Sequence, residues 1–309
     1  MSADLWSAIA TGCERAPAAA ALLWHDPTAG VDVTLRYADL AERAADLAAG
    51  LRDLGVGAAD RVAVALPNSP DVVALLLATL RLGATYVPLN PAYTAEEVGW
   101  IAENVGARVV VAHTALRDAL AASPAHSGRV VDAVAPGSAP PAPVTIAPSA
   151  PALIVYTSGT TGRPKGAVLS HRALLENLRA ILRGWEWTSA DRLLLTLPCS
   201  HLHGLALGVL GSLLHGSSLV LRARFAAEEA LADLERFGCT AMFGVPTMYN
   251  RLVQLPTGAI HRHDLARVRL WACGSAPLLA TTFERFRELF GTALVERFGM
   301  SEGGFMLAA

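Results

Sequence analysis

Residues 157–166, Thr-Ser-Gly-Thr-Thr-Gly-Arg-Pro-Lys-Gly, combine three glycines, four hydroxyl side chains and one lysine directly after an apolar run at 152–156. Glycines allow the backbone to bend so that its N–H groups point inward, which makes a cradle for phosphate oxygens. The hydroxyls can donate to the same oxygens or help to hold a magnesium ion, and Lys165 adds a positive charge. The alternative is an ordinary polar turn, but such turns seldom combine so many anion donors with a lysine. The segment therefore predicts a site for the phosphates of a nucleotide.

The segment differs from the Walker A loop of P-loop proteins. That loop places Ser or Thr directly after Gly-Lys at the start of a helix, whereas Lys165 lies between Pro164 and Gly166. Pro164 favours an extended backbone at Arg163, so the loop is predicted to stay open. The next helix is predicted to begin later, with Ser170 as its N-terminal cap. A P-loop kinase or GTPase is therefore a poor match.

Composition narrows the class of protein. The 309 residues are 53% hydrophobic, enough for a sizeable core, and their net charge of −2 shows no basic excess. Because no basic stripe with interleaved aromatic residues is present, we expect no nucleic-acid partner. The most apolar stretch, 202–221, is broken by glycines and serines, which favours a buried helix followed by a strand over a membrane span. The four cysteines are widely spaced and the N-terminus carries no basic export signal, so we expect free thiols and a cytoplasmic location.

Short apolar runs alternate with amphipathic helical patterns, which is typical of an α/β fold with mainly parallel sheets flanked by helices. Strands are predicted at 61–66, 108–112, 152–156, 192–197, 218–221, 240–243, 268–273 and 292–298. Helices are predicted at 37–54, 71–82, 95–105, 170–183, 226–237 and 278–290. Thr94 and Glu97 form a capping-box pattern at the start of the third helix. The Ala-, Pro- and Ser-rich stretch 121–151 is interpreted as a surface excursion.

In its motifs and their order, the chain resembles the adenylate-forming superfamily, which includes acyl-CoA synthetases, luciferases and the adenylation domains of peptide synthetases. Four segments carry the resemblance: 83–91, 157–166, Gly-Ser-Ala-Pro at 274–277 and Arg-Phe-Gly-Met-Ser-Glu at 297–302. The resemblance implies that residues 1–309 belong to the large AMP-binding N-terminal domain. It also implies a reaction in which a carboxylate is joined to the α-phosphate of ATP, pyrophosphate leaves, and the acyl group passes to CoA or another thiol.

The resemblance also assigns nucleotide-binding residues. It implies that Glu302 is a magnesium ligand, since magnesium prefers hard oxygen donors, and that Thr161 is a second one; an ordinary solvated carboxylate is the alternative for Glu302. Phe298 stands where the family usually has a tyrosine beside the adenine, and Ser301 where it usually has threonine. The residues expected to contact the nucleotide are Thr157, Ser158, Gly159, Thr160, Thr161, Gly162, Lys165, Gly274, Ser275, Ala276, Pro277, Phe298, Gly299, Met300 and Ser301.

The acyl site is predicted from the stretch 199–205. Peptide-synthetase domains hold the substrate amino group with an aspartate there, whereas this stretch, Cys-Ser-His-Leu-His-Gly-Leu, has no acid. A simple carboxylic acid is therefore expected. His201, which corresponds to the pocket histidine of the family, and His203 are candidates for polarising or gating the acyl pocket; the alternative is that they are packed core histidines.

The segments 201–211, 224–225 and 243–249 resemble malonyl-CoA synthetases more than long-chain enzymes. A dicarboxylic acid needs a second positive contact, for which Arg224 is the first candidate and Arg222 the second; a surface arginine is the alternative. Met300 is expected near the acyl pocket, unless it only fills the core.

The C-terminus raises a question about activity. The chain ends at Ala309, whereas the resemblance implies a further segment and a mobile C-terminal lid that supplies an aspartate and a lysine. One hypothesis is an AMP-forming acyl-CoA synthetase for a small acid, with malonate or methylmalonate as candidates, and ATP, Mg²⁺ and CoA as cofactors. In that case Lys165, Glu302 and His201 are the expected catalytic residues. The other is a non-catalytic or split adenylate-binding module that needs a separate C-terminal partner.

Overall fold

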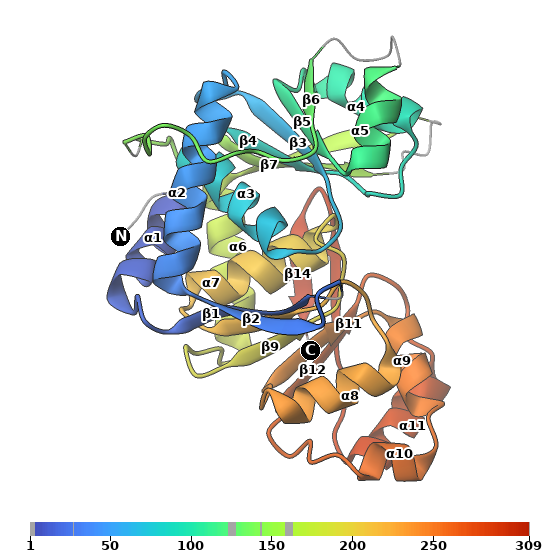
Figure 1. Cartoon of the computed structure of the whole chain (residues 1–309). Coiled ribbons are helices and arrows are strands. Elements are labelled where there is room, and N and C mark those ends of the chain that lie inside the picture. The colour runs from blue at the N-terminus through green and yellow to red at the C-terminus, as the bar shows by residue number, and fades with distance from the viewer. Residues whose placement is uncertain (1–3, 27, 123–127, 143, 158–162, 309) are drawn as a thin grey trace.

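Two mainly parallel sheets form the framework of the chain (Figure 1). The computed structural model describes residues 4–26, 28–122, 128–142, 144–157 and 163–308. Helices fill the space between the sheets and cover the outer face of each one, which gives alternating layers of helix and sheet. The predicted α/β fold class is therefore confirmed.

The larger sheet has eight strands in the order β14-β13-β12-β11-β9-β10-β1-β2. Its neighbouring strands are parallel except at the two edges, where β2 and β14 pair antiparallel to β1 and β13. The strands are β1 Ala20–Asp26, β2 Val31–Arg36, β9 Arg192–Leu195, β10 Ser218–Leu221, β11 Ala241–Gly244, β12 Leu270–Gly274, β13 Val295–Met300 and β14 Gly304–Ala308.

The smaller sheet has six strands in the order β6-β5-β3-β4-β7-β8. All of its pairings are parallel except β7 with β8, in which Thr157 lies opposite Lys165. The strands are β3 Arg61–Ala65, β4 Thr85–Pro88, β5 Val109–Ala112, β6 Arg129–Val131, β7 Pro151–Thr157 and β8 Lys165–Ser170.

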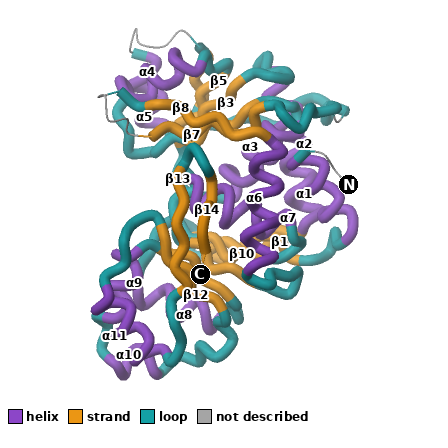
Figure 2. Tube along the Cα trace, turned by 180° about the vertical axis from the view of Figure 1, so that it is seen from behind, coloured by secondary structure: helices purple, strands orange, loops and turns teal. Residues whose placement is uncertain are grey.

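The helices form three layers (Figures 1 and 2). Between the sheets lie α1 Leu5–Arg15, α2 Tyr37–Asp53, α3 Pro70–Arg81, α6 His171–Gly184, the π-helix η1 His203–Leu210 and α7 Gly211–Leu214. The outer face of the smaller sheet is covered by α4 Ala95–Val105 and α5 Thr114–Ala121. The outer face of the larger sheet is covered by α8 Ala227–Arg236, α9 Pro246–Val253, α10 Thr257–His261 and α11 Ala280–Phe290.

Most predicted elements are present, and their caps form as expected. Ser170 accepts from the backbone N–H of Ala173, and Thr94 and Glu97 form the reciprocal capping box. The stretch 202–221 is a buried π-helix and short α-helix followed by β10. The predicted excursion at 121–151 was incomplete, because its described part contains β6. The chain around Lys165 does not wind into a helix, and the next helix begins after Ser170, as predicted; the strand that Lys165 begins, which pairs with β7, was not predicted.

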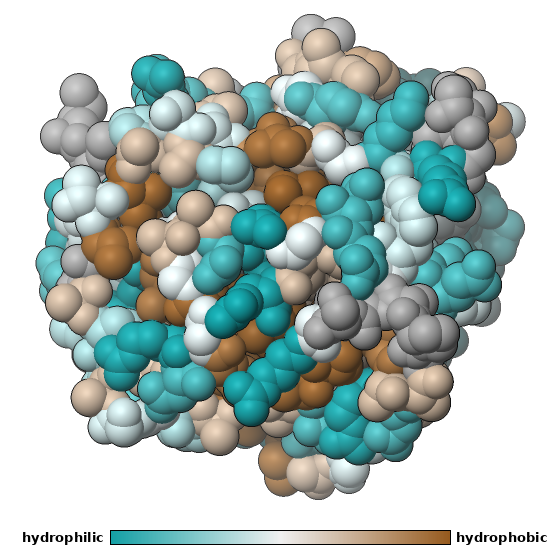
Figure 3. Space-filling view, turned by 90° about the horizontal axis from the view of Figure 1, so that it is seen from above, coloured by the Kyte–Doolittle hydropathy of each residue, from teal (hydrophilic) through white to brown (hydrophobic). Residues whose placement is uncertain are grey.

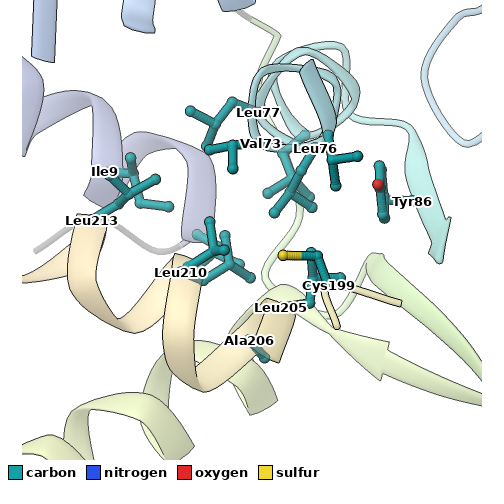
Figure 4. Packing of buried hydrophobic residues seen from close by; sticks show 14 of the residues in the cluster. Ile9, Val73, Leu76, Leu77, Tyr86, Cys199, Leu205, Ala206, Leu210 and Leu213 are labelled. Carbon is teal, nitrogen blue, oxygen red and sulfur yellow. The ribbon is translucent and has the colours of Figure 1, made fainter. Parts of the chain in front are cut away.

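The inter-sheet core is apolar throughout its central part. Figure 4 shows side chains of α1, α3, α7 and η1 meeting there, with Cys199 among them. Burial raises the pKa of the Cys199 thiol to about 12, so it stays protonated and unreactive. All four cysteines, Cys13, Cys199, Cys239 and Cys273, are free, as predicted, and the structure shows that all four are buried. In the described part of the chain, no helix has the length and hydropathy needed to cross a membrane.

His171 holds the N-terminal helix on this core. Its Nδ1 atom accepts from the backbone N–H of Leu5, and its Nε2 atom is buried without a partner among the described residues. Burial lowers the pKa of His171, although nearby Asp4 opposes the shift. Since the folded-state pKa lies below the unfolded one, the contribution of His171 to stability is complete above about pH 6.5 and declines as the pH falls.

We therefore expect His171→Asn to reduce the acid sensitivity of folding. Asparagine keeps an acceptor in place of Nδ1 but does not titrate, so the variant should lose less unfolding free energy than the parent between pH 7.5 and pH 5. Urea unfolding at the two pH values measures the difference. An unchanged difference would show that other histidines cause the acid sensitivity.

Candidate functional site

Thr157 and Glu302 meet between the two sheets, although 145 positions separate them in the sequence. Thr157 ends β7 of the smaller sheet, and Glu302 follows β13 of the larger one. The hydroxyl of Thr157 donates to Oε1 of Glu302 over 3.3 Å. The start of the glycine-rich segment and the predicted magnesium ligand are thus neighbours, as a nucleotide site with a bound cation requires.

The structure describes Arg163, Pro164, Lys165 and Gly166 of the remaining glycine-rich segment. Ser158, Gly159, Thr160, Thr161 and Gly162 lie outside the described residues, so their predicted contacts remain predictions. Lys165 is exposed at the start of β8, directly opposite Thr157. It is also the only lysine in the sequence, and every other basic side chain is an arginine or histidine.

A cavity of about 560 Å³ opens next to this point. It contains six residues that the sequence predicted for the site: His201, His203, Ser275, Gly299, Met300 and Ser301. They come from the segment before η1, from η1 itself, and from the ends of β12 and β13. The remaining wall consists of Leu197, Pro198, Leu202, Gly204, Val245, Met248, Arg297, Gly304 and Phe305.

Arg297 is the one arginine or lysine among the described residues that line this cavity, and the sequence analysis gave it no role. The residue is buried, with a relative exposure of 7%. Nε donates to His203 Nε2 over 3.3 Å, and Nη2 donates to Ser275 Oγ over 3.1 Å. The guanidinium also lies 4.9 Å from the centre of the Phe305 ring. Among the described residues, no carboxylate forms an ion pair with it.

The backbone at the ends of β12 and β14 determines which residues surround Arg297. A Cβ atom on Gly274 would lie 2.8 Å from Cγ of Arg297, so the arginine can cross β12 only because residue 274 is glycine. Ser275 has a φ of 72°, an uncommon value for a residue with a side chain. On the other side, Asn177 of α6 bonds both backbone groups of Phe305 and holds β14 in place.

The directions of the hydrogen bonds among Arg297, His203 and Ser275 leave the hydroxyl proton of Ser275 free to donate to a ligand. Burial, together with the charge of Arg297, lowers the pKa of His203 well below its usual range, so the ring is neutral near pH 7. Because Nε2 accepts from Arg297, the ring proton lies on Nδ1, which can donate to Ser275 Oγ at 3.4 Å. Ser275 Oγ thus accepts from both neighbours, and its own hydroxyl proton is free to bond a ligand. Arg297 and Ser275 together suit an anion.

The two arginines predicted for the acyl site lie elsewhere. Arg222 forms a bidentate ion pair with Asp233 of α8, which occupies its guanidinium. Arg224 is exposed and is not part of the cavity wall. The sequence feature that could have indicated Arg297 as a site residue was its position at the start of the motif 297–302.

The other residues predicted to contact the nucleotide lie close to cavity residues in the sequence but are not part of the cavity wall themselves. Gly274 is buried at the end of β12, whereas Ser275, Ala276 and Pro277 are exposed. Phe298 is 58% exposed on β13, where its ring is free to stack on a planar ligand. Its predicted contact with adenine remains a prediction.

The oxygen atoms near Thr157 fit a magnesium ion. Magnesium is usually held by one or two carboxylates together with water and substrate phosphates, and Glu302 with the Thr157 hydroxyl offers such donors. Among the described residues, no group of three or more His, Cys, Asp or Glu side chains forms a closed metal site. An ion here would therefore depend on the nucleotide for its other ligands.

Known proteins share this sequence and fold. A family model described as AMP-binding enzyme matches residues 9–309. A sulfoacetate–CoA ligase of Cupriavidus necator is 34% identical over 254 residues, which are 78% of this chain and 49% of that protein. A feruloyl-CoA synthase of Amycolatopsis is 35% identical over 274 residues, which are 87% of this chain and 54% of that protein. ATP-bound MatB from Rhodopseudomonas palustris superimposes with a TM-score of 0.88 and 31% identity, over 100% of this chain and 62% of that one.

Two conclusions follow from these matches. The chain spans about half the length of the curated relatives described above. The family model covers almost all of the chain, and the similarity to MatB extends over its whole length. The chain therefore belongs to the AMP-binding enzyme family, whose relatives described here include CoA ligases.

Proposed function

We propose that this chain supplies the nucleotide and acyl sites of an AMP-forming acid–CoA ligase. The observation that carries the proposal is the contact between Thr157 and Glu302 beside a cavity that contains Arg297. In the proposed reaction, a carboxylate oxygen attacks the α-phosphorus of ATP, pyrophosphate leaves with its bonding electrons, and an acyl-adenylate forms. The thiolate of CoA then attacks the acyl carbon and releases AMP.

The residues of this chain would act mainly by neutralising charge. Two anions must approach each other in the first step, so positive groups and N–H donors in fixed positions lower the barrier. Lys165 would contact the phosphates of ATP from β8. Glu302 and the Thr157 hydroxyl would hold Mg²⁺, which would offset phosphate charge when bound. His201 is exposed at the cavity and would contact the acyl group.

We further propose that the acid is small and carries a second anionic group, as malonate and methylmalonate do. Arg297 is a buried cation without a carboxylate partner among the described residues, and burying an unpaired charge is unfavourable unless a ligand neutralises it. A second carboxylate on the acid would accept from Arg297 and from the free hydroxyl proton of Ser275. The related sulfoacetate–CoA ligase is named for an acid that also carries two anionic groups.

Thermal unfolding with non-hydrolysable acyl-adenylate mimics tests both levels of the proposal. Malonyl, acetyl, octanoyl and aminoacyl mimics would be compared on this chain, each up to a hundred times its Kd, where stabilisation reaches about 2.7 kcal/mol. We expect the malonyl mimic to bind most tightly. A preference for the octanoyl mimic would retain the adenylate site and reject the dianionic acid. No stabilisation by any mimic would reject binding by this chain alone, and would favour a module that needs a separate partner to bind.

A further inference from the structure

A second cavity, of about 490 Å³, lies at the carboxyl edge of the smaller sheet. It shares no wall residue with the cavity around Arg297. Leu66 directly follows β3, Val111 belongs to β5, and Asp132 directly follows β6, so the ends of three adjacent strands meet there. Figure 3 views the molecule from the side of this sheet and shows apolar residues set between polar ones.

The strand order makes this edge a suitable place for a ligand. From the end of β3 the chain runs through α3 to β4, which lies on one side of β3. From the end of β5, which lies on the other side, the chain runs away through α5 to β6. The chain segments that follow β3 and β5, which are neighbouring strands, therefore run in opposite directions along the sheet. In open parallel sheets, ligands bind in the crevice that such a reversal creates.

One wall of the cavity is held firmly in place by glycines. The backbone N–H of Gly137 donates to the carbonyl of Asp46 on α2 over 3.1 Å. A Cβ atom on Gly50 would lie 1.9 Å from the carbonyl oxygen of Ala135, and one on Gly137 would lie 2.3 Å from the carbonyl carbon of Ala49. The segment 134–137 thus lies directly on α2, which only residues without side chains permit. Close backbone contacts with α2 fix the position of this wall, so we expect the cavity to exist before any ligand binds.

The lining combines an apolar floor with an acidic rim. The floor consists of Leu47, Leu66, Leu75, Val111 and Val134. The charged residues of the rim are Asp39, Glu42, Arg43, Asp46, Asp71 and Asp132.

Only some of the carboxylates of the rim form ion pairs with arginines. Arg43 pairs with Asp71, and Asp132 is paired with Arg117 of α5. Glu42 and Asp46 lie one turn apart on α2, and neither has an ion pair among the described residues.

We propose that this cavity binds a small organic cation, a primary alkylamine or alkyl diamine, independently of the adenylate site. The ammonium group would lie between the carboxylates of Glu42 and Asp46, and the hydrocarbon chain would cover the apolar floor. A metal ion fits less well, because the floor offers no oxygen ligands and no group of three potential ligand side chains is present among the described residues. The proposal goes beyond the ligase reaction, which does not involve these residues.

Calorimetric titration with hexylamine, ethylamine and hexanoate tests the proposal. The two amines carry the same charge but differ by four methylene groups, so we expect hexylamine to bind at one site roughly tenfold more tightly or better. Hexanoate has the same chain length but the opposite charge and should not bind there. Equal affinity for the two amines would mean that only a diffuse acidic surface attracts them, and would overturn the proposal.

Two variants locate the site. The double variant Glu42→Gln, Asp46→Asn should weaken hexylamine binding at least tenfold, and Ala133→Phe should block the cavity from its exposed wall. Both variants should bind the malonyl-adenylate mimic as the parent does, so a failure of this proposal is distinguishable from a failure of the proposed ligase site. Undiminished hexylamine binding by both variants would also overturn it.

Discussion

Replacing Arg297 with methionine is expected to weaken binding of the malonyl-adenylate mimic by roughly 30-fold or more. The reason is that Arg297 is the one arginine or lysine among the described residues of the cavity wall, so a carboxylate bound there would remain buried without it. The acetyl mimic has no second carboxylate, so its binding should change much less. Calorimetric titration of both mimics against parent and variant gives the two changes directly.

The same variant should leave the ligand-free chain about as stable as the parent. Within the part of the chain that the structure describes, the side chain of Arg297 bonds the neutral partners His203 and Ser275 and no carboxylate, so methionine leaves no carboxylate unpaired there. Burial lowers the pKa of Arg297 to about 10, which reflects the unfavourable environment of its charge. Removing that charge offsets the two lost hydrogen bonds, so we expect a change in unfolding free energy within about 1 kcal/mol.

Two matched variants separate the role of Arg297 from a general effect of charge. Arg224→Met removes an exposed arginine that is not part of the cavity wall, so mimic binding should stay as in the parent. Arg297→Lys keeps a charge but loses the planar pair of donors, and should restore only part of the affinity. If Arg224→Met weakens malonyl binding and Arg297→Met does not, the acyl site is the one predicted from the sequence.

The comparison of Arg224 with Arg297 illustrates how far the sequence could predict the site. The motif 297–302 singled out Glu302, which the fold brings next to Thr157, and its role as a magnesium ligand stays a prediction. It did not indicate that Arg297 is the buried cation, since that depends on η1, the glycine at 274 and the strand held by Asn177. These segments lie far apart in the sequence, and only the folded chain brings them together.

The elements of the fold that the sequence predicted have an apolar pattern of their own, whereas the missed elements depend on contacts with neighbouring elements. Central strands such as β5 are buried apolar runs, whose pattern is visible in the sequence. Edge strands are not: β2 is exposed along most of its length, and β8 begins with lysine and glycine. Both form because a neighbouring strand pairs with them. The π-helix η1 has no distinctive sequence pattern and follows from packing between the two sheets.

Replacing Lys165 with alanine is expected to weaken ATP binding by roughly tenfold to hundredfold, which corresponds to the loss of one hydrogen bond to a charged group. The side chain of Lys165 is exposed and has no ion pair or hydrogen bond among the described residues, so the unfolding temperature without ligand should not change. Titration with ATP and Mg²⁺ measures the affinity of each variant. Lys165→Arg should bind more tightly than the alanine variant, because it keeps the positive charge.

The single lysine allows the same contact to be tested without mutation. Because Lys165 is the only lysine, an amine-acylating reagent can modify one side chain and the N-terminal amine, and peptide mass spectrometry distinguishes the two. ATP should protect Lys165 from acylation and leave the N-terminal amine as reactive as before. Protection of neither amine, together with an alanine variant that binds ATP as the parent does, would show that the glycine-rich segment does not hold the phosphates. Protection of Lys165 alone would place it next to the bound nucleotide, opposite Thr157 and its partner Glu302.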